Sequence, residues 1–411
     1  MAAKKTDVLI IGAGPAGASA ALFLAAQGIP SVVIDKEAFP RDKICGDALS
    51  GKVVEVLNKL DRSLVAELNN KEDLFLGSWG VNFYAPNGEC LRVPFRTKKE
   101  IKNAPGFISK RIDFDNWLAE KLKSNPLVEL LENHEVRNYE RTTEGIRATS
   151  KNGFEIEAKL VIACDGAYSD FAKDIAGLKT EPEHNCFGLR AYYKNVAGLD
   201  KENFIELHFL NEILPGYFWI FPLPNGYANI GVGMRADKMQ AKKLNLKKAF
   251  EQVLEHNSTI KQRFQTAQAV GGVKLFGLPL GSKKRPLSGN HYMLCGDAGQ
   301  LIDPFTGEGI GNAMMSGLFA ARQAKRSLES KNFTAGFIKE YDKELYGRLG
   351  GELQLSYHMQ QLVNYPSLFN LVVRKANKNK LLQETISCMF EDLDMRERLK
   401  NPLFYFRLLF S

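Results

Sequence analysis

The most constraining feature of this 411-residue chain is a glycine-rich turn close to its beginning. Residues 8–11 read Val-Leu-Ile-Ile, apolar on both faces as in a central parallel strand, and Gly12, Gly14 and Gly17 follow with the spacing G-x-G-x-x-G. Gly12 permits a tight turn, Gly14 lets the backbone approach a pyrophosphate, and Gly17 lets a helix pack close to the strand. Asp35 ends the next strand, 23 positions after Gly12 and near the usual interval of about 20 for a ribose-binding acid. This order predicts a dinucleotide-binding β-α-β unit, and the alternative is a glycine-rich turn in an ordinary α/β protein.

Composition narrows the range of partners. The formal net charge of +8 and the pI of about 9.0 favour anionic partners, such as a phosphorylated substrate or an acidic membrane surface. No nucleic-acid-binding motif accompanies this charge, so we expect no nucleic-acid partner. The six cysteines form no C-x-x-C pair, so we predict neither a zinc nor an iron–sulfur site and expect a reducing, cytoplasmic compartment. No stretch approaches the ~20 apolar residues of a membrane-spanning helix.

The order of elements predicts an α/β fold with two kinds of sheet. Residues 160–164 and 292–295 read as buried strands and 309–328 as a long helix, whereas 184–234 is all strand. We expect a Rossmann-like nucleotide-binding domain made of separate segments, an inserted antiparallel β-sheet domain for the substrate, and C-terminal helices. The expected nucleotide-binding domain comprises residues 1–75, 101–175 and 271–335, the substrate domain 76–100 and 176–270, and the helical region 336–411.

Three further motifs follow the first turn in order. Asp165-Gly166 comes after a buried strand, Gly296-Asp297-Ala298-Gly299 comes after another, and residues 304–310, Pro-Phe-Thr-Gly-Glu-Gly-Ile, open the long helix. Together with the first turn, this set resembles the FAD-binding fold of the aromatic hydroxylase and geranylgeranyl reductase superfamily. The resemblance spans most of residues 7–330 and implies that the cofactor is FAD.

The resemblance also implies roles for single residues. Asp297 is expected to accept hydrogen bonds from the ribityl chain, and Arg111 to reach the phosphates or the ribose. Val136 is expected to meet the adenine through its backbone. The start of the long helix is expected to stabilise negative charge at the N1–C2 edge of the flavin. The other residues expected at the cofactor are Gly46, Asp165, Gly166, Gly296, Gly307, Gly309 and Ile310. The residues alone leave open a surface position for Arg111 and a purely turn-forming role for Asp165.

A narrower match lies in the inserted sheet. Residues 217–222, Tyr-Phe-Trp-Ile-Phe-Pro, are followed by Gly231-Val-Gly233, which is similar to the Y-x-W-x-F-P…G-x-G signature of geranylgeranyl reductases. Residues 40–47 resemble the P-R-x-K-x-C-G loop of the same family. Strand alternation puts Tyr217, Trp219 and Phe221 on one face, where they are expected to wall a long apolar pocket. Core packing of the sheet is the alternative for all three, and we place Tyr217 and Trp219 among the catalytic-site residues.

Cys45 is the third residue predicted for the catalytic site. Saturation of an isolated C=C bond requires a hydride and a proton, and no carbonyl group stabilises the developing charge, so a positioned proton donor is needed. In the reductases the matching cysteine is thought to lie close to the flavin, and Cys45 is therefore expected to supply or relay the proton. The alternative is a small loop residue selected for fit.

These observations predict an FAD-dependent reductase that saturates C=C bonds of an isoprenoid (geranylgeranyl-type) lipid, quinone or pigment precursor. The alternatives are a flavin-dependent monooxygenase or halogenase of the same superfamily, an electron-transfer flavoprotein, and a non-enzymatic lipid-binding module. The expected electron donor is NADPH or a small redox protein. The expected location is the cytoplasm, either free or peripheral at a membrane, with residues 402–410 as an interfacial anchor or as a last helix docked on the core.

Overall fold

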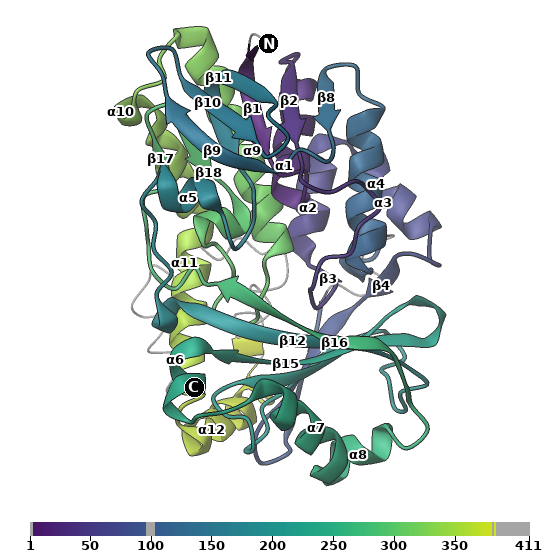
Figure 1. The fold of residues 1–411 in the computed structure, drawn as a ribbon. Helices are drawn as coiled ribbons and strands as arrows, with labels where there is room; N and C mark the ends of the chain where they lie inside the picture. Colours follow the sequence, from purple (N-terminus) through teal and green to yellow (C-terminus); the bar gives the residue numbers. More distant parts are fainter. Residues whose placement is uncertain (1–2, 96–102, 380–381, 384–411) are drawn as a thin grey trace.

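The computed structural model describes residues 3–95, 103–379 and 382–383. Its largest sheet is built around β1, which lies parallel between β2 and β11 (Figure 1). The order is β17-β18-β11-β1-β2-β8, and β10 and β9 extend antiparallel from β11. The strands are β1 (Lys4–Ile11), β2 (Ser31–Ile34), β8 (Val128–Leu131), β9 (Val136–Arg141), β10 (Ile146–Ser150), β11 (Glu155–Ala163), β17 (Ser288–Gly289) and β18 (Tyr292–Leu294). The predicted central strand therefore occupies a central position, and Val8, Leu9 and Ile10 are fully buried.

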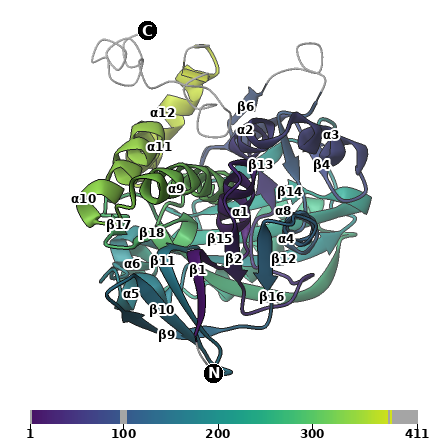
Figure 2. The same cartoon turned by 90° about the horizontal axis from the view of Figure 1, so that it is seen from above.

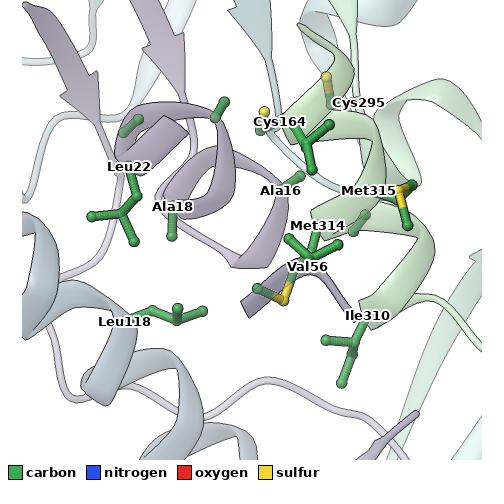
Figure 3. Close-up of a cluster of buried hydrophobic side chains, with 14 of the residues drawn as sticks. Ala16, Ala18, Leu22, Val56, Leu118, Cys164, Cys295, Ile310, Met314 and Met315 are labelled. Atoms are coloured by element: carbon green, nitrogen blue, oxygen red, sulfur yellow. The ribbon is translucent and has the colours of Figure 1, made fainter. Parts of the chain in front are cut away.

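Two helices made of small residues pack closely against this sheet. They are α1 (Pro15–Ala26) and α9 (Ile310–Ser330), which lie side by side in Figure 2. A Cβ added at Gly317 would lie 2.3 Å from the carbonyl oxygen of Ala16, and Ser19 Oγ donates to the carbonyl of Met314 at 2.7 Å. Figure 3 shows Met314 and Ala16 among the buried side chains of this layer. The α1–α9 contact brings the first glycine turn and the last predicted motif together.

Side-chain caps divide two regions that the sequence predicts as helical. Residues 49–70 form α2 (Gly51–Leu60) and α3 (Arg62–Asn70), because Asp61 is extended and its carboxylate accepts from the Ser63 N–H at 2.8 Å. Residues 237–267 contain α6 (Ala236–Ala241), α7 (Leu246–His256) and α8 (Ser258–Arg263). Asn245 and Asn257 cap α7 and α8 in the same way.

The second sheet has seven strands in the order β16-β12-β15-β14-β13-β5-β6. Its strands are β5 (Gly80–Tyr84), β6 (Cys90–Pro94), β12 (Asn185–Lys194), β13 (Ile205–His208), β14 (Tyr217–Pro222), β15 (Tyr227–Arg235) and β16 (Gln268–Pro279). All pairs are antiparallel except β13 with β5. One face packs on α7 and α8 through Phe218 and Ile220, and the other turns toward the first sheet (Figure 1).

Strand β16 corrects the predicted domain boundary at 270/271. The sequence division places residues 271–280 with the nucleotide-binding domain, but β16 pairs with β12 along most of its length and belongs to the inserted sheet. The apolar pattern of a strand does not say which sheet it joins, because that depends on a partner about 80 residues away in the chain.

The remaining elements join the two parts. A small sheet contains β3 (Ala48–Leu49), β4 (Leu76–Ser78) and β7 (Gly106–Ile108), and α4 (Arg111–Lys123) follows it. Helix α5 (Asp170–Asp174) follows β11, and the chain continues through α10 (Ala335–Ile338), α11 (Glu340–Leu362) and α12 (Pro366–Ala376). Helix α11 packs on α9, and α12 packs near β6. The predicted segment 402–410 lies outside the described residues.

Candidate active site

The three glycines of the first turn have different steric surroundings. Gly12 has φ +97°, and an added Cβ would lie 2.4 Å from the Cys164 carbonyl oxygen. A Cβ at Gly17 would lie 1.8 Å from the Gly12 carbonyl oxygen. At Gly14 the nearest atom would be Arg41 Nη2 at 3.8 Å, and the backbone there is extended. The fold thus requires Gly12 and Gly17, whereas Gly14 borders open space at the N-terminus of α1, as a pyrophosphate site needs.

The end of β2 forms the other half of this nucleotide site. Asp35 Oδ2 accepts from the Ala13 N–H at 2.7 Å, which ties the acid to the glycine turn. Burial raises the pKa of Asp35. The Asp35 carbonyl accepts from the His134 N–H at 2.9 Å, so the segment before Val136 passes beside the acid. Asp35 is thus fixed at the glycine turn, and Val136 begins β9 two residues after His134; their contacts with a ribose and an adenine stay predictions.

The buried Arg111 and the partly buried Arg41 share one carboxylate next to this turn. Arg111 Nε and Nη2 both donate to Asp115 at 2.7 Å, and Arg41 donates to the same carboxylate at 2.5 Å. Arg111 is 2 % exposed, so the alternative of a surface position is wrong. It lines the central cavity, as Cys45 does, whereas Arg41 is the cation beside Gly14.

The later motifs surround a cavity between the two sheets. Gly296 has φ +59°, and Asp297 accepts from Lys43 Nζ at 3.0 Å. Gly309 at the N-cap of α9 has no side chain, and the Glu308 carboxylate accepts from the Gly311 N–H at 2.5 Å, while the helix start with Ile310 lines the cavity. Asp165 is not among the residues that line the cavity; its carboxylate accepts from Ser169 Oγ at 2.6 Å, and its contact with the cofactor stays a prediction. Gly166, with φ +85°, lies in the same turn, also outside the cavity.

The cavity encloses about 1220 Å³, a volume that includes solvent at its open mouth. One side is formed by the N-terminal ends of α1 and α9. The opposite wall is aromatic and aliphatic and comes largely from the inserted sheet; it includes Phe95, Phe107, Ile205, Tyr217, Trp219, Phe221, Phe276 and Leu278. The two unlike walls suit two ligands side by side.

The aromatic wall is fixed to the turn before α9. Tyr217 Oη donates to the Thr306 carbonyl at 2.8 Å. A Cβ added at Gly307 would lie 2.9 Å from Tyr217 Oη. Trp219 packs over Gly231, where an added Cβ would lie 2.0 Å from Cζ2. Gly46 approaches Phe221, with an added Cβ 3.0 Å from Cε2. The glycines of the two narrower motifs make room for the aromatic rings.

Cys45 lies on the cavity between these walls. Burial raises the pKa of its thiol, so the group is protonated at neutral pH. The next polar residue, Asp47, is completely buried with φ +70° and also lines the cavity. The Asn229 side-chain amide donates both to the Cys45 carbonyl and to Asp47 Oδ2, each at 2.8 Å. Sequence reasoning missed Asp47 and Asn229, although Asp47 directly follows the Cys-Gly pair.

Comparison with known proteins agrees with this geometry. The model of the FAD binding domain family matches residues 5–322. The chain belongs to this family. Digeranylgeranylglycerophospholipid reductase of Thermoplasma volcanium is 31% identical to it over 349 residues, which are 82% of each chain.

Two solved structures share the fold. A geranylgeranyl bacteriochlorophyll reductase-like protein from Thermoplasma acidophilum aligns with a TM-score of 0.80 and 23% identity, covering 94% of this chain and 96% of that one. A flavin-dependent brominase aligns with a TM-score of 0.74 and 21% identity, covering 98% and 99%. At these identities the likeness concerns the fold, a Rossmann-like domain with an inserted sheet and C-terminal helices.

FAD is the cofactor of this oxidoreductase, and the residues present fit it. The open Gly14, the N-terminus of α1 and Arg41 suit the pyrophosphate, while Asp35 suits the ribose. Asp297 and the start of α9, both on the cavity, suit the flavin end. Among the described residues, no cluster of His, Cys, Asp and Glu has the arrangement of a metal site, and no helix is long and apolar enough to span a membrane.

Proposed function

We propose that the chain saturates C=C bonds in a geranylgeranyl-type chain of a lipid, quinone or pigment precursor. The observation that carries this proposal is the aromatic wall of Tyr217, Trp219 and Phe221 in the same cavity as the N-terminus of α9. A prenyl chain offers almost nothing to hydrogen-bond, so shape and apolar surface must recognise it. The relatives named digeranylgeranylglycerophospholipid reductases support the same substrate class.

In this reaction bound reduced FAD supplies the hydride, and the residues of the chain orient the substrate and deliver the proton. Tyr217 is fixed by its bond to Thr306, so the wall keeps its position relative to α9. The protonated Cys45 thiol is the proton donor of the proposal, because it lies on the cavity and burial keeps it neutral. Glu308, also on the cavity, accepts from the Gly311 N–H at 2.5 Å and serves the helix rather than the substrate.

The proposal includes an external electron donor and a lipid surface. The sequence contains one dinucleotide turn, which FAD uses, so NADPH would dock without a Rossmann unit of its own, or a small redox protein would deliver electrons. We place the protein in the cytoplasm at the membrane surface, because its substrate is a lipid and its net charge is +8.

The test is anaerobic reduction of the bound flavin followed by addition of a geranylgeranyl lipid. Flavin reoxidation together with a gain of two hydrogens per saturated bond, measured by mass spectrometry, is expected. A lipid of unchanged mass would reject the proposal for that substrate. Oxygen consumption with a hydroxylated or halogenated product would instead support the monooxygenase or halogenase alternative.

A further inference from the structure

A carboxylate lies at the helix start that borders the flavin end of the cavity. Glu308 directly precedes Gly309, the N-cap residue of α9, and lines the cavity together with Asp297 and Ile310. Its Oε1 accepts from the Gly311 N–H at 2.5 Å. A helix N-terminus attracts negative charge, whereas an ionised carboxylate at the same place repels it. The turn before α9 therefore exerts two opposite electrostatic effects on a group bound beside it.

The backbone of Glu308 is fixed on both sides. Its N–H donates to Thr306 Oγ1 at 3.1 Å, and its carbonyl accepts from the Asp303 N–H at 2.8 Å and from Asn312 Nδ2 at 3.3 Å. A Cβ added at Gly311 would lie 2.7 Å from Glu308 Oε1, and Glu308 is 7 % exposed. The carboxylate is therefore held against the first turn of the helix and shielded from water.

The nearest buried cation compensates this carboxylate only in part. Lys52 on α2 is 1 % exposed, and its ammonium group forms an ion pair with Glu352 of α11 at 2.8 Å. The same ammonium group also acts on Glu308 and on Asp303. The charged side chains buried around this turn are Lys52 and Arg348 together with Glu55, Asp303, Glu308 and Glu352. Carboxylates thus outnumber cations in this part of the described structure, and negative charge remains at the turn.

The charge of Glu308 depends on pH in a defined direction. Burial raises the pKa of Glu308, while Lys52 and the Gly311 N–H act against this rise. The titratable groups around Glu308 are Lys52 from α2, Asp303 from its own turn, Glu352 from α11, and Asp297 with Lys43, which meet at the cavity. The carboxylate is ionised at high pH and becomes neutral as the pH falls through its raised pKa.

We propose that the Glu308 carboxylate lowers the reduction potential of the bound flavin and so makes it a stronger hydride donor. A flavin gains negative charge on reduction, and a buried carboxylate opposes this gain because water screens its field only weakly. The inference rests on the proposed function, since an isolated C=C bond has no carbonyl group to accept electron density and needs a strongly reducing donor.

Glu308→Gln removes the charge and keeps the helix cap, because the amide oxygen can accept the Gly311 N–H. The reduction potential, measured anaerobically without lipid, tests the charge alone. The variant is expected to favour reduced flavin about 10-fold or more relative to the wild type, a rise of about 30 mV for a two-electron couple. The matched control is Asp342→Asn, because Asp342 on α11 accepts from the Leu287 N–H at 2.8 Å and does not line the cavity. The control should keep the wild-type potential, and equal potentials of Glu308→Gln and wild type would overturn the proposal.

Glu308→Asp separates the charge from the cap. This variant keeps a carboxylate but shortens the side chain by one methylene, which weakens the bond to Gly311. Its potential should stay near that of the wild type, and a rise as large as that of Glu308→Gln would overturn the proposal in favour of the cap. The difference between wild type and Glu308→Gln should also be larger at pH 9 than at pH 6, because protonation neutralises Glu308. A difference that grows toward low pH would contradict a charge effect.

The wild-type protein alone provides a second test, which does not depend on how the variants fold. A lowered potential means that the apoprotein binds oxidised FAD more tightly than reduced FAD, here by about 10-fold or more. Anaerobic titration of the apoprotein with each form measures the two dissociation constants, and tighter binding of reduced FAD would overturn the proposal. Failure of the proposed function is seen separately, as wild-type protein with reduced flavin that leaves the mass of the lipid unchanged.

Discussion

Replacing Gly14 by alanine separates the requirements of the fold from those of the cofactor. The backbone at Gly14 has φ −68° and ψ −176°, which any residue adopts, and the added Cβ would make only an ordinary contact with Arg41 at 3.8 Å. Alanine is a poorer N-cap residue than glycine, which costs about 0.5–1 kcal/mol of stability. It also lowers the conformational entropy of the unfolded chain, which stabilises the protein by about 0.4–1 kcal/mol. The stability of the FAD-free protein should therefore change by less than about 1 kcal/mol.

The effect on FAD should be larger. The methyl group would occupy the space through which a pyrophosphate approaches the turn, and overpacking of this kind costs about 1–3 kcal/mol. The dissociation constant for FAD is then expected to rise about 5- to 150-fold. Titration of FAD into the apoprotein by flavin fluorescence measures the constant, and thermal unfolding of the apoprotein checks the fold. An unchanged dissociation constant for Gly14→Ala would refute the assignment of this turn.

Two other glycines provide controls for this experiment. A Cβ at Gly17 would lie 1.8 Å from the Gly12 carbonyl oxygen, so Gly17→Ala should destabilise the apoprotein itself, by about 3 kcal/mol or more. Gly347 lies inside α11 with open space around its Cα, so Gly347→Ala should stabilise the helix by up to about 1 kcal/mol and leave FAD binding unchanged. An apoprotein of Gly17→Ala as stable as the wild type would contradict the steric account.

Cys45→Ser should retain FAD and slow the saturation of the first C=C bond about 10²-fold or more, because a hydroxyl is a weaker acid than a thiol. Anaerobic reoxidation of the flavin measures this rate, and equal rates for the variant and the wild type would remove Cys45 from the mechanism. Gly231→Ala should lower the melting temperature and shift the fluorescence of Trp219, because the added Cβ would lie 2.0 Å from the indole ring. Gly233→Ala should be tolerated, because its Cβ would lie 3.8 Å from the same ring. Identical behaviour of the two variants would refute the packing argument. Folding raises the pKa of Asp47 from about 3.8 to about 6. The contribution of the protonated carboxyl to the free energy of unfolding is therefore fully present below about pH 4 and is lost as the pH rises through 6. The shift corresponds to about 3 kcal/mol, so Asp47→Asn should unfold at a higher temperature than wild type at pH 8 and at a similar temperature at pH 4; a variant less stable at pH 8 would contradict the sign.

The nucleotide-binding end of the molecule was predictable because its signals are local. The strand, the glycine spacing and Asp35 lie within one stretch of about 30 residues, and each residue type has a steric or electrostatic reason. The same holds for the alternation that places Tyr217 and Trp219 on one face of β14. Such patterns need no knowledge of distant partners.

The surroundings of Asp47 were not predictable in this way. Tyr192 and Asn229 lie 145 and 182 residues from Asp47 in the sequence, so no local pattern reports that they hydrogen-bond its carboxylate. Asp165, by contrast, has a local partner, because its carboxylate accepts from Ser169 Oγ four residues away, and its predicted contact with the cofactor stays a prediction. Arg111 was predicted at the nucleotide, but its burial and its position beside Cys45 emerge only when α4 packs against the 40–47 loop.

The contacts that join the two sheets gather around the cavity, which links substrate recognition to the flavin end of the site. Tyr217 on the inserted sheet is bonded to the Thr306 carbonyl in the turn that starts α9, and Asn229 on the same sheet is bonded to the loop that carries Cys45 and Asp47. A lipid that packs against the aromatic wall therefore contacts residues that are hydrogen-bonded to both of these segments. Because Tyr217 and Asn229 reach across from the inserted sheet to these two segments, a substitution in the wall is expected to alter the surroundings of both Cys45 and the flavin end. Chain-length preference and rate are for this reason expected to change in concert among variants of the wall.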